Sequence, residues 1–352
     1  MDATAARPAM VRSPTGPAWL AATALTLAAL GCGPTDGPKV VVYSSAAPGF
    51  SGPILEDHGR KSGVEVVTRF EAKGVDAAGL ARIIVQESPR PRCDLFWSGS
   101  LFEILRLRQK GMLASWSPPN APEIPARFRA KDGTWYGFAA KARVLLVHTG
   151  LVAEGDRPKG LDDLVAPRWK GRAALARPSS GSTATHFTCL FAAWGDEKTR
   201  AFVGALKANG VGVLRDNREV AAAVGSGRFA FGLTDSDDAV GEVGAGHPVA
   251  IVYPDREPGQ LGTLFLPDAL AIPKGAPDPG AAEAMGNALL GPETEARLAR
   301  GPSGRSPLNR TTKAPAGVES PRTVHAMEVD FEAAATLWDR VAAFLAAEFA
   351  GP

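Results

Sequence analysis

Three aspartates stand within four positions of the sequence, in the segment FGLTDSDDAVGEVGAG at residues 231–246. Asp235, Asp237 and Asp238 follow an apolar run, and carboxylates this close repel one another unless a helix N-terminus, solvent, a basic group or a cation offsets them. Their oxygens are hard ligands that suit Ca²⁺, Mg²⁺, Mn²⁺ or ferric iron, and they also suit ammonium and polyol groups. A structural role is open as well, in which Asp235 caps a helix starting near Ser236 and the other two favour its dipole.

A second candidate site is the segment PSSGSTAT at residues 178–185, which runs into a predicted helix. Its glycine frees the backbone, its hydroxyls donate hydrogen bonds, and a helix N-terminus follows, so the segment has the features of a cradle for a small anion. We take Ser180, Ser182 and Thr183 as ligand-binding candidates. An ordinary Ser/Thr-rich helix cap shows the same pattern.

Four further polar residues stand at or near the ends of predicted strands. Ser44 and Ser45 end the first strand, Glu71 follows the second, and Arg143 lies in a later apolar run. In an open α/β sheet, ligands bind beyond the carboxyl ends of the strands, so these side chains are binding candidates. For Glu71 and Arg143 the alternative is a solvated position.

The elements that must position these residues alternate between strand and helix. Short β-branched or aromatic runs are separated by helical patterns with Pro near their starts and Gly near their ends. This alternation predicts an α/β protein with mostly parallel sheets. The first predicted strands cover 39–45, 64–70 and 93–99, and later ones cover 169–175, 210–214, 228–234 and 262–272.

Composition narrows the class of protein. Hydrophobic residues make up 45% and charged residues 22% of the 352-residue chain, which is ordinary for a globular protein of about two domains. The net charge of +2 gives no field that points to nucleic acid. Cys93 and Cys189 are expected as two buried free thiols, and no zinc-ligand spacing is present. The sequence contains no GxSxG, HExxH, GxGxxG or Walker pattern, so we do not expect an enzyme.

The N-terminus predicts export. Arg7 and Arg12 precede the short apolar run AWLAATALTLAAL at residues 18–30, which is too short to span a bilayer as a mature helix and is typical of a secretory signal peptide. The residues ALGC that end at Cys32 resemble a bacterial lipobox, so we expect a signal peptide over 1–32, a lipidated Cys32 and a tether over 33–38. Cleavage nearby without lipidation is the alternative.

The order of segments resembles the ferric-iron-type substrate-binding proteins of bacterial ABC transporters. The resemblance covers about 39–310 and rests on five segments in order. These are VVVYSS, CDLFWSGSLFEILRLRQKGML, DGTWYGFAAKARVLLVHTGLV, LDDLVAPRWKGRAALARPSSGSTATH and LLGPETEARLARGPSGRSPL. It implies a two-lobed class II periplasmic binding protein, in which each lobe is a mostly parallel sheet flanked by helices.

The same resemblance implies a layout and partners. Lobe 1 would hold 39–140 plus 264–352, lobe 2 would hold 141–263, and hinges would lie near 139–148 and 262–271. A small solute would bind in the cleft between the lobes of a monomer, which a lipid anchor holds at the membrane on the periplasmic side or cell surface. An ABC permease and its ATPase would be the partners, with no nucleic acid involved.

The ligand itself is left open by the sequence. In iron-binding members of this family, two adjacent tyrosines bind ferric iron, whereas the corresponding positions here are Asp237 and Asp238. We place a metal ion first, ferric iron or another hard cation, bound by these two carboxylates and accompanied by an anion. A small organic solute such as a zwitterion, a phosphonate-like compound or a polyol is the alternative. Two alternatives belong to other functional classes, namely a secreted lipoprotein hydrolase and a purely structural surface lipoprotein. No obligatory cofactor is expected.

Overall fold

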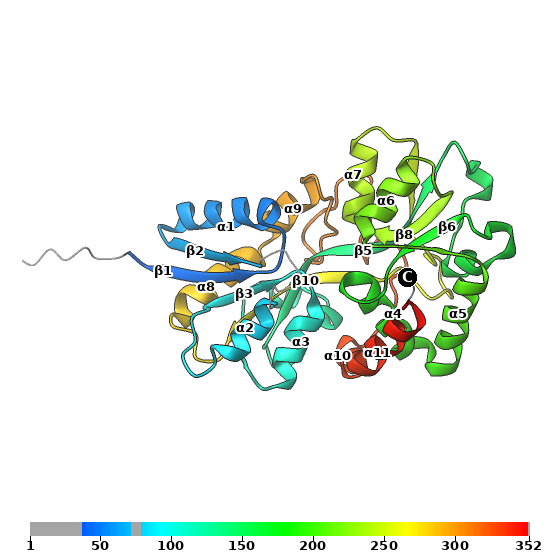
Figure 1. Cartoon of the computed structure of the whole chain (residues 1–352). Helices are drawn as coiled ribbons and strands as arrows, with labels where there is room; N and C mark the ends of the chain where they lie inside the picture. Colours follow the sequence, from blue (N-terminus) through cyan, green and yellow to red (C-terminus); the bar gives the residue numbers. More distant parts are fainter. Residues whose placement is uncertain (1–36, 72–78, 351–352) are drawn as a thin grey trace, which may run out of the picture. The chain divides into compact units, whose positions relative to one another are not determined.

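A computed structural model describes residues 37–71 and 79–350 of the chain. The predicted signal peptide, Cys32 and most of the tether lie outside these residues. Within the described part of the chain, none of the helices has the length and apolar character needed to cross a membrane. Residues 37–350 belong to one unit (Figure 1).

The first half of the fold is built on three parallel strands. Strand β1 pairs with β2 on one side and with β3 on the other. Helices follow each strand because the apolar positions change from a period of two to a helical period. The elements are β1 (Lys39–Ser44), α1 (Pro48–Ser62), β2 (Glu65–Phe70), α2 (Leu80–Gln86), β3 (Leu95–Ser98), α3 (Leu101–Gln109) and β4 (Leu113–Ala114).

Two long strands connect this half to the second one. Strand β5 (Tyr136–His148) pairs antiparallel with β10 (Phe265–Pro273) through its first residues, and with β8 and β9 through residues 143–148. Within β5 all residues except Lys141 and His148 are buried, as expected for a strand covered on both faces. The strands follow the order β2-β1-β3-β10-β5-β8-β6-β7, and we call the parts on either side of residue 143 of β5 the first and second half-sheet.

The second half-sheet again combines parallel strands with helices. Strand β6 lies between β7 and β8 and runs parallel to both. The elements are β6 (Ala173–Ala176), α4 (Gly181–Trp194), α5 (Asp196–Ala208), β7 (Gly212–Leu214), α6 (Asn217–Gly225), β8 (Phe231–Asp235), α7 (Ser236–Gly244) and β9 (Val249–Val252). Short 3-10 turns occupy Ala121–Glu123, Ala126–Phe128, Glu154–Asp156, Leu161–Val165 and Pro167–Trp169.

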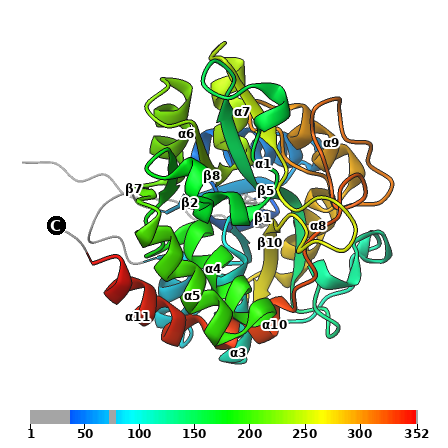
Figure 2. The same ribbon diagram turned by 90° about the vertical axis from the view of Figure 1, so that its right-hand side faces the viewer.

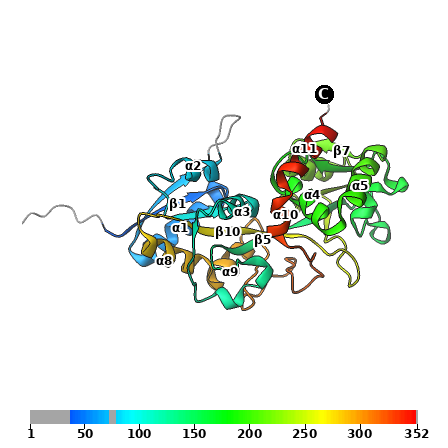
Figure 3. The same cartoon turned by 90° about the horizontal axis from the view of Figure 1, so that it is seen from below.

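The C-terminal helices cover both halves. Helices α8 (Pro279–Leu289) and α9 (Pro292–Arg300) contact β1, β3, β10 and β5. Helix α10 (Phe331–Thr336) packs against both α3 and α4, and α11 (Trp338–Glu348) packs against α4, as Figures 2 and 3 show. The predicted lobe 1 includes these last two helices, but their main neighbour is a helix of the predicted lobe 2. The division into lobes and hinges stays a prediction.

The two remaining thiols lie in different halves of the fold. Cys93, just before β3, and Cys189, within α4, are buried free cysteines. Burial raises the pKa of both. They therefore behave as small apolar core residues, as expected from the sequence.

Candidate functional site

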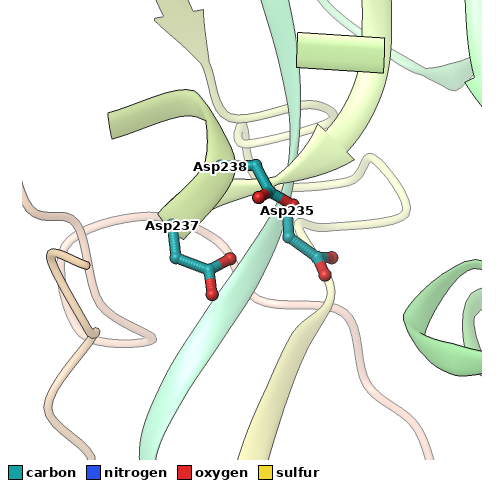
Figure 4. A group of neighbouring side chains, drawn as sticks. All are labelled: Asp235, Asp237 and Asp238. Atoms are coloured by element: carbon teal, nitrogen blue, oxygen red, sulfur yellow. The ribbon is translucent and has the colours of Figure 1, made fainter. Parts of the chain in front are cut away.

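The aspartate cluster begins where β8 passes into α7, as Figure 4 shows. Asp235 is the last residue of β8 and is 4% exposed. Its Oδ1 accepts a hydrogen bond of 2.5 Å from Nη1 of the fully buried Arg143, which lies opposite it on β5. Its Oδ2 accepts 2.6 Å from the Ser182 hydroxyl and lies 3.4 Å from Nζ of Lys141. Asp235 is therefore the anion of a buried network.

The rest of the network satisfies the guanidinium of Arg143. Nη1 donates to Asn217 Oδ1 at 3.0 Å, and Nη2 donates to Thr183 Oγ1 at 3.2 Å. Nε donates to Nδ1 of His186 at 3.5 Å. Burial, and then the charge of Arg143, lowers the pKa of His186 to about 3, so this histidine is neutral at physiological pH.

Asp235 occupies the N-cap position of α7 without making the capping hydrogen bond. Its backbone is extended as a cap requires, but its carboxylate makes no capping hydrogen bond and instead turns to Arg143. Burial acts to raise the pKa of Asp235, but the charges of Lys141 and Arg143 outweigh it and hold this pKa below its ordinary value. The two basic groups are therefore what offsets this carboxylate.

Asp237 and Asp238 stand in the first turn of α7, where the helix dipole favours acidic groups. One carboxylate oxygen from each of the three aspartates lies within 4.8 Å of the others. Asp237 pairs with Arg305 at 3.3 Å, and Asp238 lies 3.7 Å from Nε of the exposed Arg218. Burial, followed by the charges of Asp237 and Asp235, raises the pKa of Asp238 to about 7.

A cavity of about 460 Å³ lies beside this cluster, between the two half-sheets. We call it the cleft cavity. Its wall includes the starts of α1, α3 and α4, at Ala47, Ser100 and Ser180. These N-cap residues make no side-chain capping hydrogen bond. The charged residues of its wall are Glu71, Glu103, Arg106, Lys141, Asp237 and Arg305.

Gly181 shows how closely the backbone can approach a molecule in the cleft cavity. It is the first residue of α4, its φ is +64°, and no atom of residues 37–71 and 79–350 lies within 4 Å of the place where a Cβ would stand. A left-handed backbone of this kind favours glycine. The start of α4 therefore presents bare backbone to the cavity.

The structure separates the predicted site residues into two groups. Ser45, Glu71, Ser180 and Asp237 line the cleft cavity. The others do not line it: Ser44 is fully buried beside Ser51, whereas Arg143, Ser182, Thr183 and Asp235 form the buried network, and Asp238 lies near Arg218. We assign Ser44, Arg143, Ser182, Thr183 and Asp235 a supporting position and propose no direct ligand contact for them.

Sequence reasoning missed several charged residues of the cavity wall. Lys141 and Arg305 are the most important, because each forms an ion pair with one of the aspartates. Glu103 lies on α3, where its carboxylate accepts 2.7 Å from Ser98 and 3.3 Å from Ser45. Burial raises the pKa of Glu103. Only its position soon after the carboxyl end of β3, where ligands of open α/β sheets bind, could have pointed to this glutamate.

Comparison with known proteins adds relatives of the same fold. An Fe(3+)-binding periplasmic protein of Serratia marcescens is 25% identical over 218 residues, which cover 62% of this chain and 63% of that protein. The apo ferric ion-binding protein A of Pasteurella haemolytica superposes with a TM-score of 0.77 at 22% identity, over 89% of this chain and 99% of that one.

A second solved structure carries an organic ligand. A periplasmic binding protein of Actinobacillus pleuropneumoniae with exogenous fructose-6-phosphate bound has a TM-score of 0.73 at 20% identity, over 89% of this chain and 98% of that one. These similarities confirm the predicted two-lobed α/β fold.

The family model described as bacterial extracellular solute-binding protein matches residues 91–333, which is more than half of the chain. The wall of the cleft cavity is formed by strand ends and helix starts. The chain belongs to the bacterial extracellular solute-binding protein family, and is thus a binding protein and not an enzyme.

Proposed function

We propose that this protein is the solute-capturing component of an ABC import system. It works outside the cytoplasmic membrane and delivers its ligand to a permease driven by an ATPase. Family membership and the fold shared with periplasmic binding proteins support this role. The ligand binds in the cleft cavity, between 39–140 plus 264–352 on one side and 141–263 on the other, and closure about the shared strands traps it.

We assign to the cavity a small organic solute that carries an oxyanion, such as a phosphate, phosphonate or carboxylate group. One observation carries this assignment: α1, α3 and α4 all begin on the cavity wall without a capping side chain. The first N–H groups of a helix have no partner inside the helix, and they lie at the positive end of its dipole. Helix α1 begins with Pro48, which has no N–H, so α3 and α4 supply most of these donors, and the three helix ends together suit an anion.

The side chains of the wall support the same ligand class. Lys141 and Arg305 bring positive charge to the cavity, and Glu71 and Glu103 add carboxylates to its wall. This mixture of charges suits a solute with an oxyanion at one end and an ammonium or hydroxyl groups at the other.

A metal ion accompanied by an anion, with ferric iron first, is the second candidate. It is favoured by the three carboxylates that lie within 4.8 Å of one another and by the ferric-iron-binding relative. Asp237 and Asp238 would be its ligands. Asp235 pairs closely with Arg143, and Asp237 lies 3.3 Å from Arg305, so two of the three aspartates already face a cation, which reduces their attraction for a metal ion. We therefore rank the organic solute first, in the reverse of the order drawn from the sequence.

The test combines native mass spectrometry with elemental analysis of the purified protein. A bound organic mass, or uptake of a phosphate- or carboxylate-bearing compound, supports the first candidate. Near-stoichiometric metal that is lost in the Asp237→Ala, Asp238→Ala variant supports the second. Turnover of a substrate without saturable binding would contradict both.

Anchoring by a lipid on Cys32 is a separate proposal. It rests on the lipobox-like residues before this cysteine. The Cys32→Ser variant should move the protein from the membrane fraction to the soluble fraction. Wild-type protein that is already soluble after cell disruption would contradict the anchor.

A further inference from the structure

Arg305 joins the two half-sheets across the cleft cavity. It belongs to the segment after α9 and is 7% exposed, yet its side chain contributes to the cavity wall. Its guanidinium lies 3.5 Å from Asp268 on β10 and 4.7 Å above the ring of Phe50 on α1, both in the first half-sheet. Its Nη2 lies 3.3 Å from Asp237 on α7, in the second. No other cation in the described ranges 37–71 and 79–350 pairs with Asp237.

The backbone beside Arg305 is fixed to the middle of β5. Ser306 and Ala140 exchange two backbone hydrogen bonds of 2.8 and 2.7 Å. The buried carboxylate of Glu295 accepts N–H groups from Ala139 at 2.7 Å, from Leu308 at 3.0 Å and from Asn309 at 2.6 Å.

Ala139 has a φ of +46°, a left-handed conformation that persists only where the surroundings hold it. The segment that carries Arg305 is therefore mounted on the predicted hinge strand. A movement of β5 at the predicted hinge would therefore also move the backbone of Arg305.

The guanidinium of Arg305 still has capacity for another acceptor. An arginine has five N–H donors in a planar fork that matches an oxyanion. Its contacts to Asp237 and Asp268, at 3.3 and 3.5 Å, are longer than the 2.7–2.9 Å that is typical of charge-assisted hydrogen bonds. Among the described residues, neither its Nε nor Oδ1 of Asp237 has a hydrogen-bond partner. The pair between Arg305 and Asp237 is thus a loose contact that a stronger acceptor can replace.

We propose that Arg305 is the specificity-determining residue for the oxyanion of the ligand, which it binds in exchange for Asp237. The inference rests on the proposed function, because it requires a ligand with such a group. The exchange releases Asp237 from Arg305. It also joins the oxyanion of the ligand to the segment that carries Arg305, which is hydrogen-bonded to β5. Asp237 is then a competitor of the ligand for Arg305, which is the opposite of a metal-binding role.

The test is calorimetric titration of the full purified chain with inorganic phosphate, fructose-6-phosphate and 2-aminoethylphosphonate. Arg305→Gln should weaken the probe that binds by roughly 30-fold or more, because a pair of charge-assisted hydrogen bonds is lost. Arg300→Gln is the matched control, since this exposed arginine at the end of α9 does not line the cleft cavity, and it should change the affinity less than about threefold. Asp237→Asn should tighten the binding of inorganic phosphate.

The outcomes separate this inference from the proposed function. If the wild-type chain binds an oxyanion probe and Arg305→Gln behaves like Arg300→Gln, the role of Arg305 is refuted and the proposed function stands. If the wild-type chain binds none of the three probes, the proposed ligand class fails and the role of Arg305 fails with it. If Arg305→Gln does not fold, Asp237→Asn decides: tighter binding of phosphate supports the exchange, and unchanged or weaker binding overturns it.

Discussion

Replacing Asp235 by asparagine tests whether this residue supports the fold and not the ligand. The change removes the negative charge between Arg143 and Lys141, which lie 2.5 and 3.4 Å from the carboxylate. Arg143 is fully buried, so its charge cannot be solvated in exchange. Breaking one partner out of a buried ion pair costs about 3–5 kcal/mol. This is a large part of the 5–15 kcal/mol that typically separates folded from unfolded protein.

Urea unfolding at pH 7, followed by tryptophan fluorescence, measures this loss as a fall in the free energy of unfolding. Asp162→Asn is the matched control, because Asp162 is exposed, and it should change that free energy by less than about 0.5 kcal/mol. Adding Arg143→Met to Asp235→Asn should recover part of the loss, because it removes a charge left unpaired. If Asp235→Asn lowers the free energy of unfolding by less than about 1 kcal/mol, with the urea dependence unchanged, Asp235 does not stabilise the fold as argued.

Two further predictions concern stability. The fold raises the pKa of Asp238 from 3.8 to about 7, so the folded state favours the protonated carboxyl. The resulting contribution to the free energy of unfolding is complete below pH 3.8, and it is lost as the pH rises towards 7. Asp238→Asn should therefore flatten the fall in unfolding free energy between pH 4 and 7, measured by urea titrations across that range, and parallel profiles for both proteins would contradict this. Ala139→Gly should be neutral or stabilising by up to about 1 kcal/mol, because glycine adopts the left-handed backbone without strain. Ala140→Gly should destabilise by about 1 kcal/mol, and an equal loss in both variants would show that φ at position 139 is not strained.

Much of the fold could be predicted because its signals are local. The parallel strands are bounded by Gly and Pro, and their helices show a helical period, so strands such as β1, β3 and β8 lie close to their predicted ranges. Helix α1 begins at Pro48, which takes the first-turn position that proline prefers. The region of β5 was predicted only through the family resemblance, as part of a hinge. A strand that is buried on both faces shows no alternation of apolar and polar residues, so its pattern does not mark it as a strand.

The position of the candidate site could be predicted from the sequence, but the residues that pair with its aspartates could not. The aspartates could be placed at the end of β8, since an apolar strand directly precedes them. The pairing of Asp235 with Arg143 joins residues that are 92 positions apart, and sheet register alone brings them together. Arg305 follows a Gly-rich turn with no pattern that marks a binding residue, so only the fold reveals its place in the cavity wall.

The sharing of β5 between the half-sheets has a consequence for cooperativity. Its first residues pair with β10, and residues 143–148 pair with β8 and β9, so neither half keeps its full set of paired strands when the other unfolds. The lobes should therefore melt in a single transition, although they resemble separate domains. A fragment that spans only residues 149–264 lacks the strand on which its sheet is built, and it should be unable to fold alone.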